Sequence, residues 1–175
     1  VTPSENNGKV AIVGAGPAGI TCAYHLARNG HEVTIYESLD EPGGMSAVGI
    51  PDYRLPRNIL QREVQQIQKM GVSINYGQAI GKDLILSQLE NDFDAVFIGI
   101  GAQDSINMGI EGEDREYQGF IPGLAYLREV NAGRDPYPPG KKVVVIGGGN
   151  VAIDCVRCSL RTDKEDIQLV YRRTR

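Results

Sequence analysis

An α/β fold with a parallel sheet is predicted by three features of this 175-residue sequence. Short runs of β-branched and apolar residues alternate with segments of helical periodicity. Glycine is abundant, at 22 residues, and glycine-rich turns follow two of the strand-like runs. A strand–turn–helix–strand pattern also occurs twice, which is typical of parallel βαβ units.

The first of these units covers residues 9–36. Lys9–Val13 is short, apolar and β-branched, which indicates a buried strand, and the glycine turn 14–19 follows it. Residues 20–29 carry apolar side chains at helical spacing, and Gly30 is placed to end that helix. Val33–Tyr36 is expected to be the second strand of the unit.

The segment from residue 38 to residue 55 has no regular periodicity and is rich in Gly and Pro. A loop of this length inside a compact domain is usually functional. A helix is expected from Pro56 to Met70, with its apolar residues on one side and Gly71 after it. Residues 102–120 read as a polar loop. Further strands are expected at Val72–Asn75 and Asp94–Ile98, and further helices at Leu84–Leu89 and Pro122–Val130.

The strand–turn–helix–strand pattern recurs near the end of the sequence. It places a strand at Val143–Ile146, a turn at Gly147–Gly149, a helix at Val151–Leu160 and a strand at Ile167–Tyr171. The preceding stretch, NAGRDPYPPG, has the composition of a linker. We therefore predict one domain over residues 1–137 and the first βαβ unit of a second domain over residues 138–175.

The first glycine turn has the pattern of a dinucleotide site. It reads Gly14-Ala15-Gly16-Pro17-Ala18-Gly19, which fits G-x-G-x-x-G. Gly14 permits the tight turn, Gly16 lets the backbone approach a pyrophosphate, and Gly19 lets the helix lie close to the strand. Free N–H groups and the helix dipole then favour phosphate. Glu37 ends the next strand, where a carboxylate can accept hydrogen bonds from ribose hydroxyls. The alternative is a packing turn with a surface glutamate.

The loop after Glu37 indicates which dinucleotide this is. Gly43-Gly44-Met45 lies where a second backbone approach to a long cofactor would fall. A plain NAD domain has no need for a glycine loop at that point, whereas FAD must be held further along, toward its isoalloxazine ring. The sequence therefore predicts FAD in the first domain, and Ser38 and Gly101 complete the predicted set of contacts.

The second glycine turn predicts a different nucleotide. Residues 147–152, GGGNVA, fit G-x-G-x-x-A between a strand and a helix. The following strand ends in Tyr171-Arg172-Arg173 and not in an acid. Guanidinium groups bind a 2′-phosphate that a carboxylate would repel, so NADP(H) is favoured over NAD(H). The alternative is that these arginines only neutralise a helix end or a neighbouring acid.

Composition narrows the class of partner and the compartment. The formal net charge of −4 argues against nucleic acid, apart from a basic cluster at the last residues. No apolar run reaches the roughly 18 residues of a membrane helix, and the polar first residues are not a signal peptide. The start at Val1 indicates that something upstream was removed. Three cysteines without a secretory context indicate a reducing cytoplasm.

Several chemistry-bearing residues are interpreted as structural. Cys155 and Cys158 form a CxxC that a flavin-dependent disulfide reductase could use, but we expect them, like Cys22, to be core residues. No second pair completes a zinc site, so no metal is predicted. His25 and His31 have no spaced partner. Asp154 is interpreted as an acid favoured by the helix dipole, with a water-mediated cofactor role as the alternative.

Five segments, in order and spacing, resemble one known family. They are VAIVGAGPAGITCAYHLARNGHEVTIYES, EPGGMSAVGIPDYRLPRNIL, DAVFIGIGA, VVVIGGGNVAIDCVR and VYRRTR. Together they are similar to the small (β) subunit of bacterial glutamate synthase, the flavin domain of dihydropyrimidine dehydrogenase and the NADPH:ferredoxin-type oxidoreductases of anaerobes. GIPDYRLPR is the most specific segment, and the resemblance covers nearly the whole chain.

The resemblance implies a Rossmann-like FAD/NAD(P)-binding fold of the disulfide-reductase type. It implies FAD in the first domain, NADPH in the second, and hydride transfer from nicotinamide to flavin. Electrons would then leave through iron–sulfur clusters on a missing domain or a partner subunit. By resemblance, Arg54, Gly44 and Met45 contact FAD, and Ile80 lies at its adenine end. Asn150, Val151, Arg172 and Arg173 would contact NADPH.

Two departures from the family pattern lead to the expectation of a truncated chain. The family's cysteine-rich segment upstream of the first strand and its returning C-terminal segment, with a Gly-Asp motif, are not found here. The chain alone is therefore expected not to catalyse the full reaction, and a nucleotide-binding fragment without turnover is the alternative. Unpaired strand edges lead to a further expectation of self-association or marginal stability.

Overall fold

A computed structural model describes residues 7–113, 115, 117–134 and 140–173 of the chain. The described residues divide into two compact units. The first unit runs to Ala47 and continues over Leu55–Ala102. The second unit consists of Val48–Arg54 and the chain from Gln103 onward.

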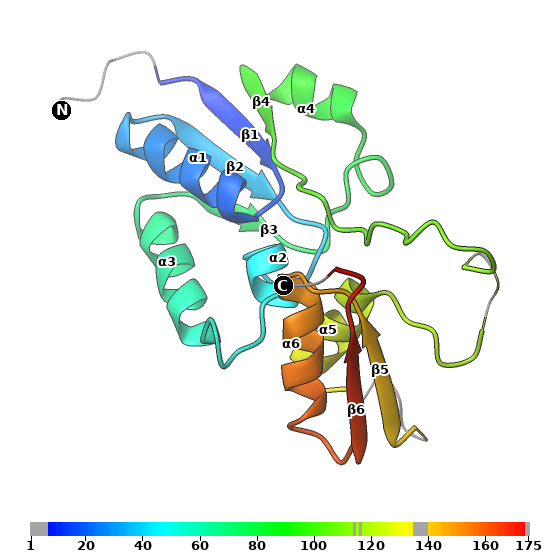
Figure 1. Ribbon diagram of the computed structural model, residues 1–175. Coiled ribbons are helices and arrows are strands. Elements are labelled where there is room, and N and C mark those ends of the chain that lie inside the picture. The colour runs from blue at the N-terminus through cyan, green and yellow to red at the C-terminus, as the bar shows by residue number, and fades with distance from the viewer. Residues whose placement is uncertain (1–6, 114, 116, 135–139, 174–175) are drawn as a thin grey trace. The chain divides into compact units, whose positions relative to one another are not determined.

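The first unit is built on a four-stranded parallel sheet within the described residues. Its strands are β1 (Lys9–Val13), β2 (Glu32–Tyr36), β3 (Ser73–Asn75) and β4 (Ala95–Ile98), as Figure 1 shows. Their order across the sheet is β3-β2-β1-β4. The chain therefore reverses its direction of growth at β1, and such a switch point is where ligands bind in open α/β sheets.

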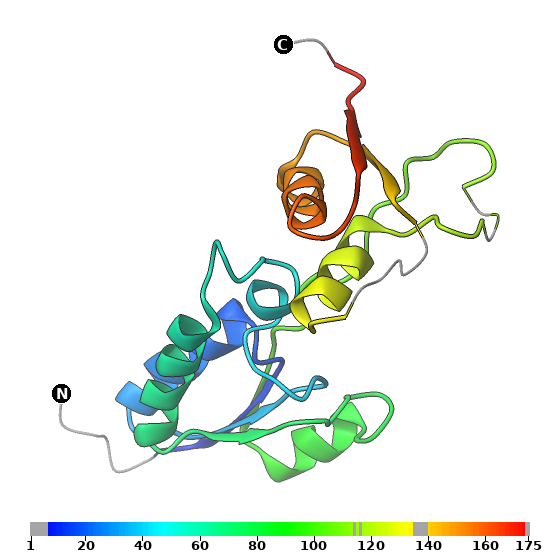
Figure 2. The ribbon, with the colours of Figure 1, turned by 90° about the horizontal axis from the view of Figure 1, so that it is seen from below.

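Helices cover both faces of this sheet. In Figure 2, α1 (Pro17–Arg28) and α3 (Arg57–Lys69) lie on one side and α4 (Leu86–Asp92) on the other. Alternate residues of β1 serve the two faces, because successive side chains of a strand point in opposite directions. One core contains Val10, Ile12, Ala15, Ala23, Val33, Ile35, Ile67 and Val72. The other contains Ala11, Val13 and Leu89. The fold class predicted from the sequence is confirmed.

The second unit combines a parallel pair of strands with two helices. Strand β5 (Lys142–Ile146) pairs with β6 (Asp166–Val170), and α6 (Asn150–Ser159) connects them. Helix α5 (Gly123–Asn131) packs on α6 through a buried cluster. Its members are Tyr126, Leu127, Cys155 and Cys158. Tyr126 and Ser159 also share a buried hydrogen bond of 2.8 Å between their hydroxyl groups.

The two units do not follow the boundary expected between residues 137 and 138. Packing of α5 on α6 joins the chain from Gln103 to the second βαβ pattern, and Val48–Arg54 joins it too. The expected linker lies partly outside the described residues. Which cofactor each unit holds is not decided by this division and stays a prediction.

Most element boundaries lie within one residue of expectation, and three helices differ more clearly. Helix α1 begins at Pro17, inside the expected turn, because proline at the first helical position leaves no N–H unsatisfied. Helix α2 (Met45–Val48) lies within the segment expected to be irregular. Helix α4 begins at Leu86, two residues late, where the Gln88 side chain accepts the Ile85 N–H at 2.9 Å. None of the described helices is long and apolar enough to cross a membrane.

The exposed face of β5 and β6 leads to a prediction about association. Val144, Ile146 and Val170 are 59%, 57% and 48% exposed, and Ile146 pairs with Val170. We expect the chain to self-associate through this face, and replacement of Val144 and Ile146 by Lys to favour the monomer, since burying unpaired lysine charges in an apolar contact is costly. Sedimentation velocity over a concentration series measures this.

The matched control is Leu160→Lys, which changes a residue 64% exposed just after α6. It should leave association unchanged. A wild-type chain that stays monomeric and monodisperse at every concentration would contradict the prediction.

Candidate functional site

Two of the three glycines in the first turn are required by packing. Gly14 has a φ of +101°, and its N–H donates to the Tyr36 carbonyl at 2.8 Å. A Cβ on Gly14 would lie 2.5 Å from the Gly99 carbonyl oxygen. A Cβ on Gly19 would lie 1.9 Å from the Gly14 carbonyl oxygen, so α1 can approach β1 this closely only with glycine there. The roles predicted for Gly14 and Gly19 in the turn and in helix packing are consistent with this geometry.

Gly16 differs, because the fold tolerates a side chain there. Its φ of −74° and ψ of 179° are open to any residue. A Cβ would meet only the Gly44 Cα within 4 Å, at 4.0 Å. The space at Gly16 is therefore not filled by protein packing. No side chain caps the start of α1, so its first N–H groups are available to an anion.

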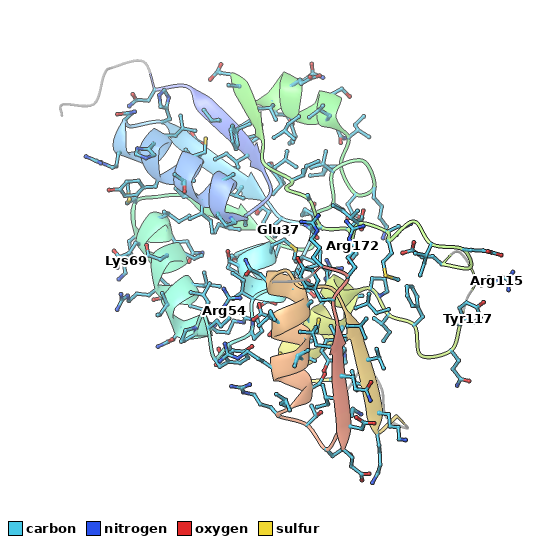
Figure 3. All side chains as sticks on the ribbon, viewed as in Figure 1. Glu37, Arg54, Lys69, Arg115, Tyr117 and Arg172 are labelled. Atoms are coloured by element: carbon cyan, nitrogen blue, oxygen red, sulfur yellow. The ribbon has the colours of Figure 1, made fainter. Side chains whose placement is uncertain are left out.

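Glu37 is buried at the carboxyl end of β2, at 3% exposure (Figure 3). Its Oε2 accepts the Ala15 N–H at 2.7 Å. Its Oε1 accepts the Leu39 N–H at 2.8 Å and the Ser38 hydroxyl at 3.1 Å. A carboxylate has about four acceptor positions, so these three bonds leave room for one ribose hydroxyl. Glu37 thus stabilises the conformation of the glycine turn, a function that the sequence pattern did not indicate. Ser38 donates a hydrogen bond to Glu37.

The second glycine pair lies against the first turn. The Gly43 N–H donates to the Ala15 carbonyl at 2.8 Å. A Cβ on Gly44 would lie 3.0 Å from the Gly16 Cα. Both glycines have positive φ, 110° and 51°, and Met45 begins α2 directly after them. The structure therefore places Gly43 and Gly44 beside the first glycine turn, and their contact with FAD stays a prediction.

The segment after β4 completes this edge of the sheet. The Gly99 N–H donates to the Val13 carbonyl at 2.8 Å, and Gly101 has a φ of +67° with open space around it. Ile80 follows β3, with its side chain against the Ala11, Val13 and Leu89 core and a backbone bridge to Leu84, and its predicted place at the adenine end of FAD stays a prediction. The glycine turn, Glu37 and the segment from Gly99 to Gly101 follow the carboxyl ends of β1, β2 and β4.

The second glycine turn repeats the bonding of the first. The Gly147 N–H donates to the Val170 carbonyl at 2.9 Å, as Gly14 does to Tyr36. Gly149 has a φ of −86° and nothing within 4 Å of an added Cβ, so it resembles Gly16. Ala152 is buried in the position corresponding to Gly19, so the packing of α6 accommodates a Cβ there.

The remaining predicted residues of the second unit are exposed at the same end. Asn150 and Val151 begin α6, and no side chain caps its start. Arg172, labelled in Figure 3, and Arg173 follow β6 after Tyr171, and both are exposed. The residue before them, Tyr171, lies against Gly148 of the second glycine turn. Guanidinium groups that follow it would favour an anion at that turn.

Arg54 and Asp154 form an ion pair that the sequence did not predict. Arg54 Nη1 lies 2.5 Å from Asp154 Oδ2, and the side chains are 40% and 5% exposed. Figure 3 labels Arg54. The Tyr53 hydroxyl donates to Asp154 Oδ1 at 3.3 Å. Asp154 is thus a buried ion-pair partner and not only an acid favoured by the helix dipole. The predicted contact of Arg54 with FAD stays a prediction.

Further contacts hold the 48–54 segment in the second unit. The Asn131 amide donates to the carbonyls of Val48 and Ile50, at 2.9 and 3.3 Å. The guanidinium carbons of Arg157 and Arg161 lie 4.7 and 4.0 Å from the Tyr53 ring centroid. Cation–π contacts at such distances are stabilising. The segment is therefore anchored at both its ends to α5 and α6.

Cys155 and Cys158 are buried free thiols on α6, as expected. Burial, with a smaller contribution from neighbouring Cys158 and Asp154, raises the pKa of Cys155 to about 12. Burial also raises the pKa of Cys158. Thiolates, not thiols, are the nucleophiles of disulfide chemistry, so both are poorly suited to it near neutral pH. No group of three metal-ligating side chains occurs among the described residues.

Comparison with known proteins places this geometry in a family. The family model for pyridine nucleotide-disulphide oxidoreductases matches residues 8–175. The chain belongs to this family. The glutamate synthase small-subunit-like proteins that the sequence resembles are among its relatives.

Particular relatives agree with this. The chain is 57% identical over 174 residues to the NADPH-Fe(3+) oxidoreductase subunit beta of Geobacter sulfurreducens, covering 98% of the chain and 26% of the relative. It is 37% identical over 175 residues to the glutamate synthase [NADPH] small chain of Escherichia coli, covering 94% and 37%. The chain thus spans well under half of either relative.

A solved structure supports the fold. FprA of Mycobacterium tuberculosis in complex with NADPH matches with a TM-score of 0.76 and 24% identity. The match covers 95% of this chain and 43% of FprA. At this identity the similarity establishes the fold.

Removal of one acceptor from Glu37 should destabilise the first unit. In Glu37→Gln an amide nitrogen replaces one carboxylate oxygen, so one buried N–H loses its acceptor. We expect the free energy of unfolding to fall by about 2 kcal/mol. Urea unfolding followed by far-UV circular dichroism, without nucleotide, measures this in a chain that lacks Trp.

Glu32→Gln is the control for Glu37→Gln. Glu32 lies on the same strand, and its ion pair with Lys9 is 3.8 Å long and largely exposed. Such pairs contribute about 0–1 kcal/mol. Equal unfolding midpoints for the two variants would refute the role of Glu37.

The raised pKa of Cys155 predicts slow alkylation. At about pH 8.5 an ordinary thiol is roughly half ionised, whereas Cys155, with a pKa of about 12, stays protonated. Because the folded chain binds this proton more tightly, the contribution of Cys155 to stability falls as pH rises from about 9 toward 12.

Iodoacetamide treatment with peptide mass spectrometry tests this prediction. Cys155 should remain unmodified in the native chain and react fully in urea. Equal rates in the two conditions would show that Cys155 is accessible and ionised.

Proposed function

We propose that this chain is the nucleotide-binding part of a flavoprotein that passes electrons from NADPH through FAD to iron–sulfur clusters. One observation carries the proposal. The two glycine turns share their backbone bonding but are followed by different chemistry, a buried Glu37 in one unit and Tyr171-Arg172-Arg173 in the other. This difference suits the binding of a different dinucleotide by each unit.

FAD is proposed for the first unit because its turn has space and donors that protein packing does not use. Gly16 is not required by the fold, and Gly43-Gly44 adds a second backbone approach beside it. Glu37 retains an acceptor position for a ribose hydroxyl. Bound FAD would supply the ring that accepts hydride, while the chain binds the pyrophosphate and orients the ribose.

NADPH is proposed for the second unit on the same reasoning. Gly149 leaves the approach to α6 open, and the start of that helix is uncapped. Arg172 and Arg173 would pair with the 2′-phosphate, since guanidinium binds phosphate through paired hydrogen bonds. Asn150 and Val151 lie where they would meet the pyrophosphate.

The acceptor of the electrons is proposed only by class. Two relatives are named NADPH-Fe(3+) oxidoreductase subunit beta and glutamate synthase [NADPH] small chain, so each is one chain of a larger enzyme. By analogy, an electron-accepting subunit or domain would receive electrons from this part. This would be a glutamate synthase large subunit or a ferredoxin-like protein. The free cysteines suit a reducing cytoplasm.

Two alternatives remain distinguishable by experiment. A disulfide reductase using Cys155 and Cys158 is disfavoured, because burial keeps both thiols protonated. A nucleotide-binding fragment without turnover would bind FAD but would not lose its yellow colour with NADPH.

Two matched glycine variants test the proposal. Gly16→Ala and Gly149→Ala add a methyl group where backbone and packing tolerate it, so both should fold. Each should displace only its own dinucleotide. The loss of one or two charge-assisted phosphate contacts, at about 1.5–3 kcal/mol each, weakens binding tenfold or more.

Visible spectra after FAD addition and removal of excess measure the first site, and calorimetric titration with NADPH measures the second. Gly16→Ala should lose FAD and keep NADPH, and Gly149→Ala the reverse. Bleaching of retained flavin by NADPH would support turnover. If neither variant changes either affinity, the proposed sites are wrong.

A further inference from the structure

The internal repeat shows that Asp154 has no charged counterpart in the first unit. Gly14 and Gly147 begin the two turns, and each donates its N–H to the carbonyl at the end of the neighbouring strand. At the same distance along the chain from these glycines lie Thr21 on α1 and Asp154 on α6. Thr21 is exposed and neutral, whereas Asp154 is buried and acidic. A glycine turn and its helix therefore fold without an acid at this position.

Asp154 lies one helical turn from the start of α6. It follows Asn150, the first residue of the helix, by four positions, so the two residues share one face. Helical side chains lean toward the N-terminus, which brings the carboxylate toward the uncapped start of the helix. A negative charge at this place opposes the binding of an anion there unless a cation compensates it.

Arg54 supplies that cation from a segment that is 100 residues away in the sequence. Its Nη1 donates to Asp154 Oδ2, and the Tyr53 hydroxyl donates to Oδ1 of the same carboxylate. The Asn131 amide holds the other end of the segment through the Val48 carbonyl. All of these residues belong to the second unit. Arg54 is therefore a cation fixed on α6.

The guanidinium group of Arg54 keeps donors for a further partner. It has five N–H donors in a rigid fork. Within the described part of the chain, its side chain donates to Asp154 alone, and it is 40% exposed. Arg54 can therefore bind the carboxylate and a second anion together.

We propose that Arg54 is a binding residue of the second nucleotide site, where it contacts the pyrophosphate of the dinucleotide, and that Asp154 is the positioning residue that holds it. The inference rests on the proposed NADPH site and adds to it a residue whose resemblance-based assignment is to FAD. The pyrophosphate is the group concerned, because it is the anion that binds at the start of the helix after such a turn.

Calorimetric titration with NADPH, and displacement of NADPH by NADH, test this in the chain and its variants. Both nucleotides carry the pyrophosphate, so Arg54→Gln should weaken both by the same factor. The loss of one charge-assisted phosphate contact corresponds to roughly tenfold or more. Arg172→Gln should weaken NADPH alone. An equal loss for the two nucleotides therefore assigns Arg54 to the pyrophosphate.

Two further variants separate binding from folding. Arg54→Gln leaves a buried carboxylate unpaired, so the double variant Arg54→Gln/Asp154→Asn, which removes both charges, serves if the single variant does not fold. It should also bind both nucleotides more weakly than the wild-type chain. Arg54→Lys keeps the charge without the fork and should recover part of the affinity.

Asp154→Asn tests the positioning role. It removes a negative charge beside the anion, which by charge alone would tighten binding. We expect weaker binding of both nucleotides instead, because Arg54 loses its anchor. Tighter binding would overturn the role of Asp154.

Lys142→Gln is the matched control for loss of one positive charge. Lys142 is exposed and begins β5, at the opposite end of that strand from the glycine turn. Its replacement should leave both dissociation constants unchanged.

The remaining outcomes decide between the inference and the proposed function. Wild-type affinities in folded Arg54→Gln would overturn the inference and leave the NADPH site intact. Loss of FAD with unchanged NADPH binding would also overturn it, and would assign Arg54 to the contact that the resemblance implies. A wild-type chain that binds neither NADPH nor NADH would overturn the proposed site together with the inference.

Discussion

The buried carboxylate of Glu37 connects three segments of the first unit that are distant in sequence. Its side chain accepts the Ala15 N–H of the glycine turn and the Leu39 N–H of the following loop. Its own N–H donates to the Asn75 carbonyl at the end of β3, and its carbonyl accepts the Gln78 N–H. A buried carboxylate is costly unless such donors surround it. The carboxyl edge of the sheet is therefore organised around one charge.

This arrangement decides which donors remain for a ligand. Because Glu37 binds the Ala15 N–H, that group is not available to a phosphate. The available donors are those at the start of α1, which no side chain caps. The helix dipole acts at the same place. The carboxylate thus shapes the turn and shifts anion binding toward the first turn of the helix, which separates the positive and negative parts of the proposed site.

The local parts of this fold could be predicted from the sequence, and the distant contacts could not. Each βαβ unit is defined by neighbouring residues, namely a β-branched run, spaced glycines and a helical stripe. The start of α1 at Pro17 was missed because the glycine pattern was treated as ending the turn, although proline favours the first helical position. The pair of Arg54 with Asp154 joins residues 100 apart. Neither periodicity nor spacing carries information about such a contact, so the membership of residues 48–54 in the second unit was not predicted.

Some glycines of the two turns are required by packing within the protein, and others are not. The second kind is the one that indicates a ligand. Gly14 and Gly19 are demanded by backbone contacts, whereas a Cβ on Gly148 would meet the half-exposed ring of Tyr171. Gly16 and Gly149 are demanded by nothing in the protein, since an added Cβ would meet at most one atom at 4.0 Å. A glycine costs conformational entropy on folding, which favours its replacement where packing and φ allow a side chain. In the proposed function, a ligand that approaches the backbone accounts for glycine at these two positions, in both units. In this proposal the backbone repeat supplies a common anion-binding turn, while the side chains that follow β2 and β6 would select the nucleotide.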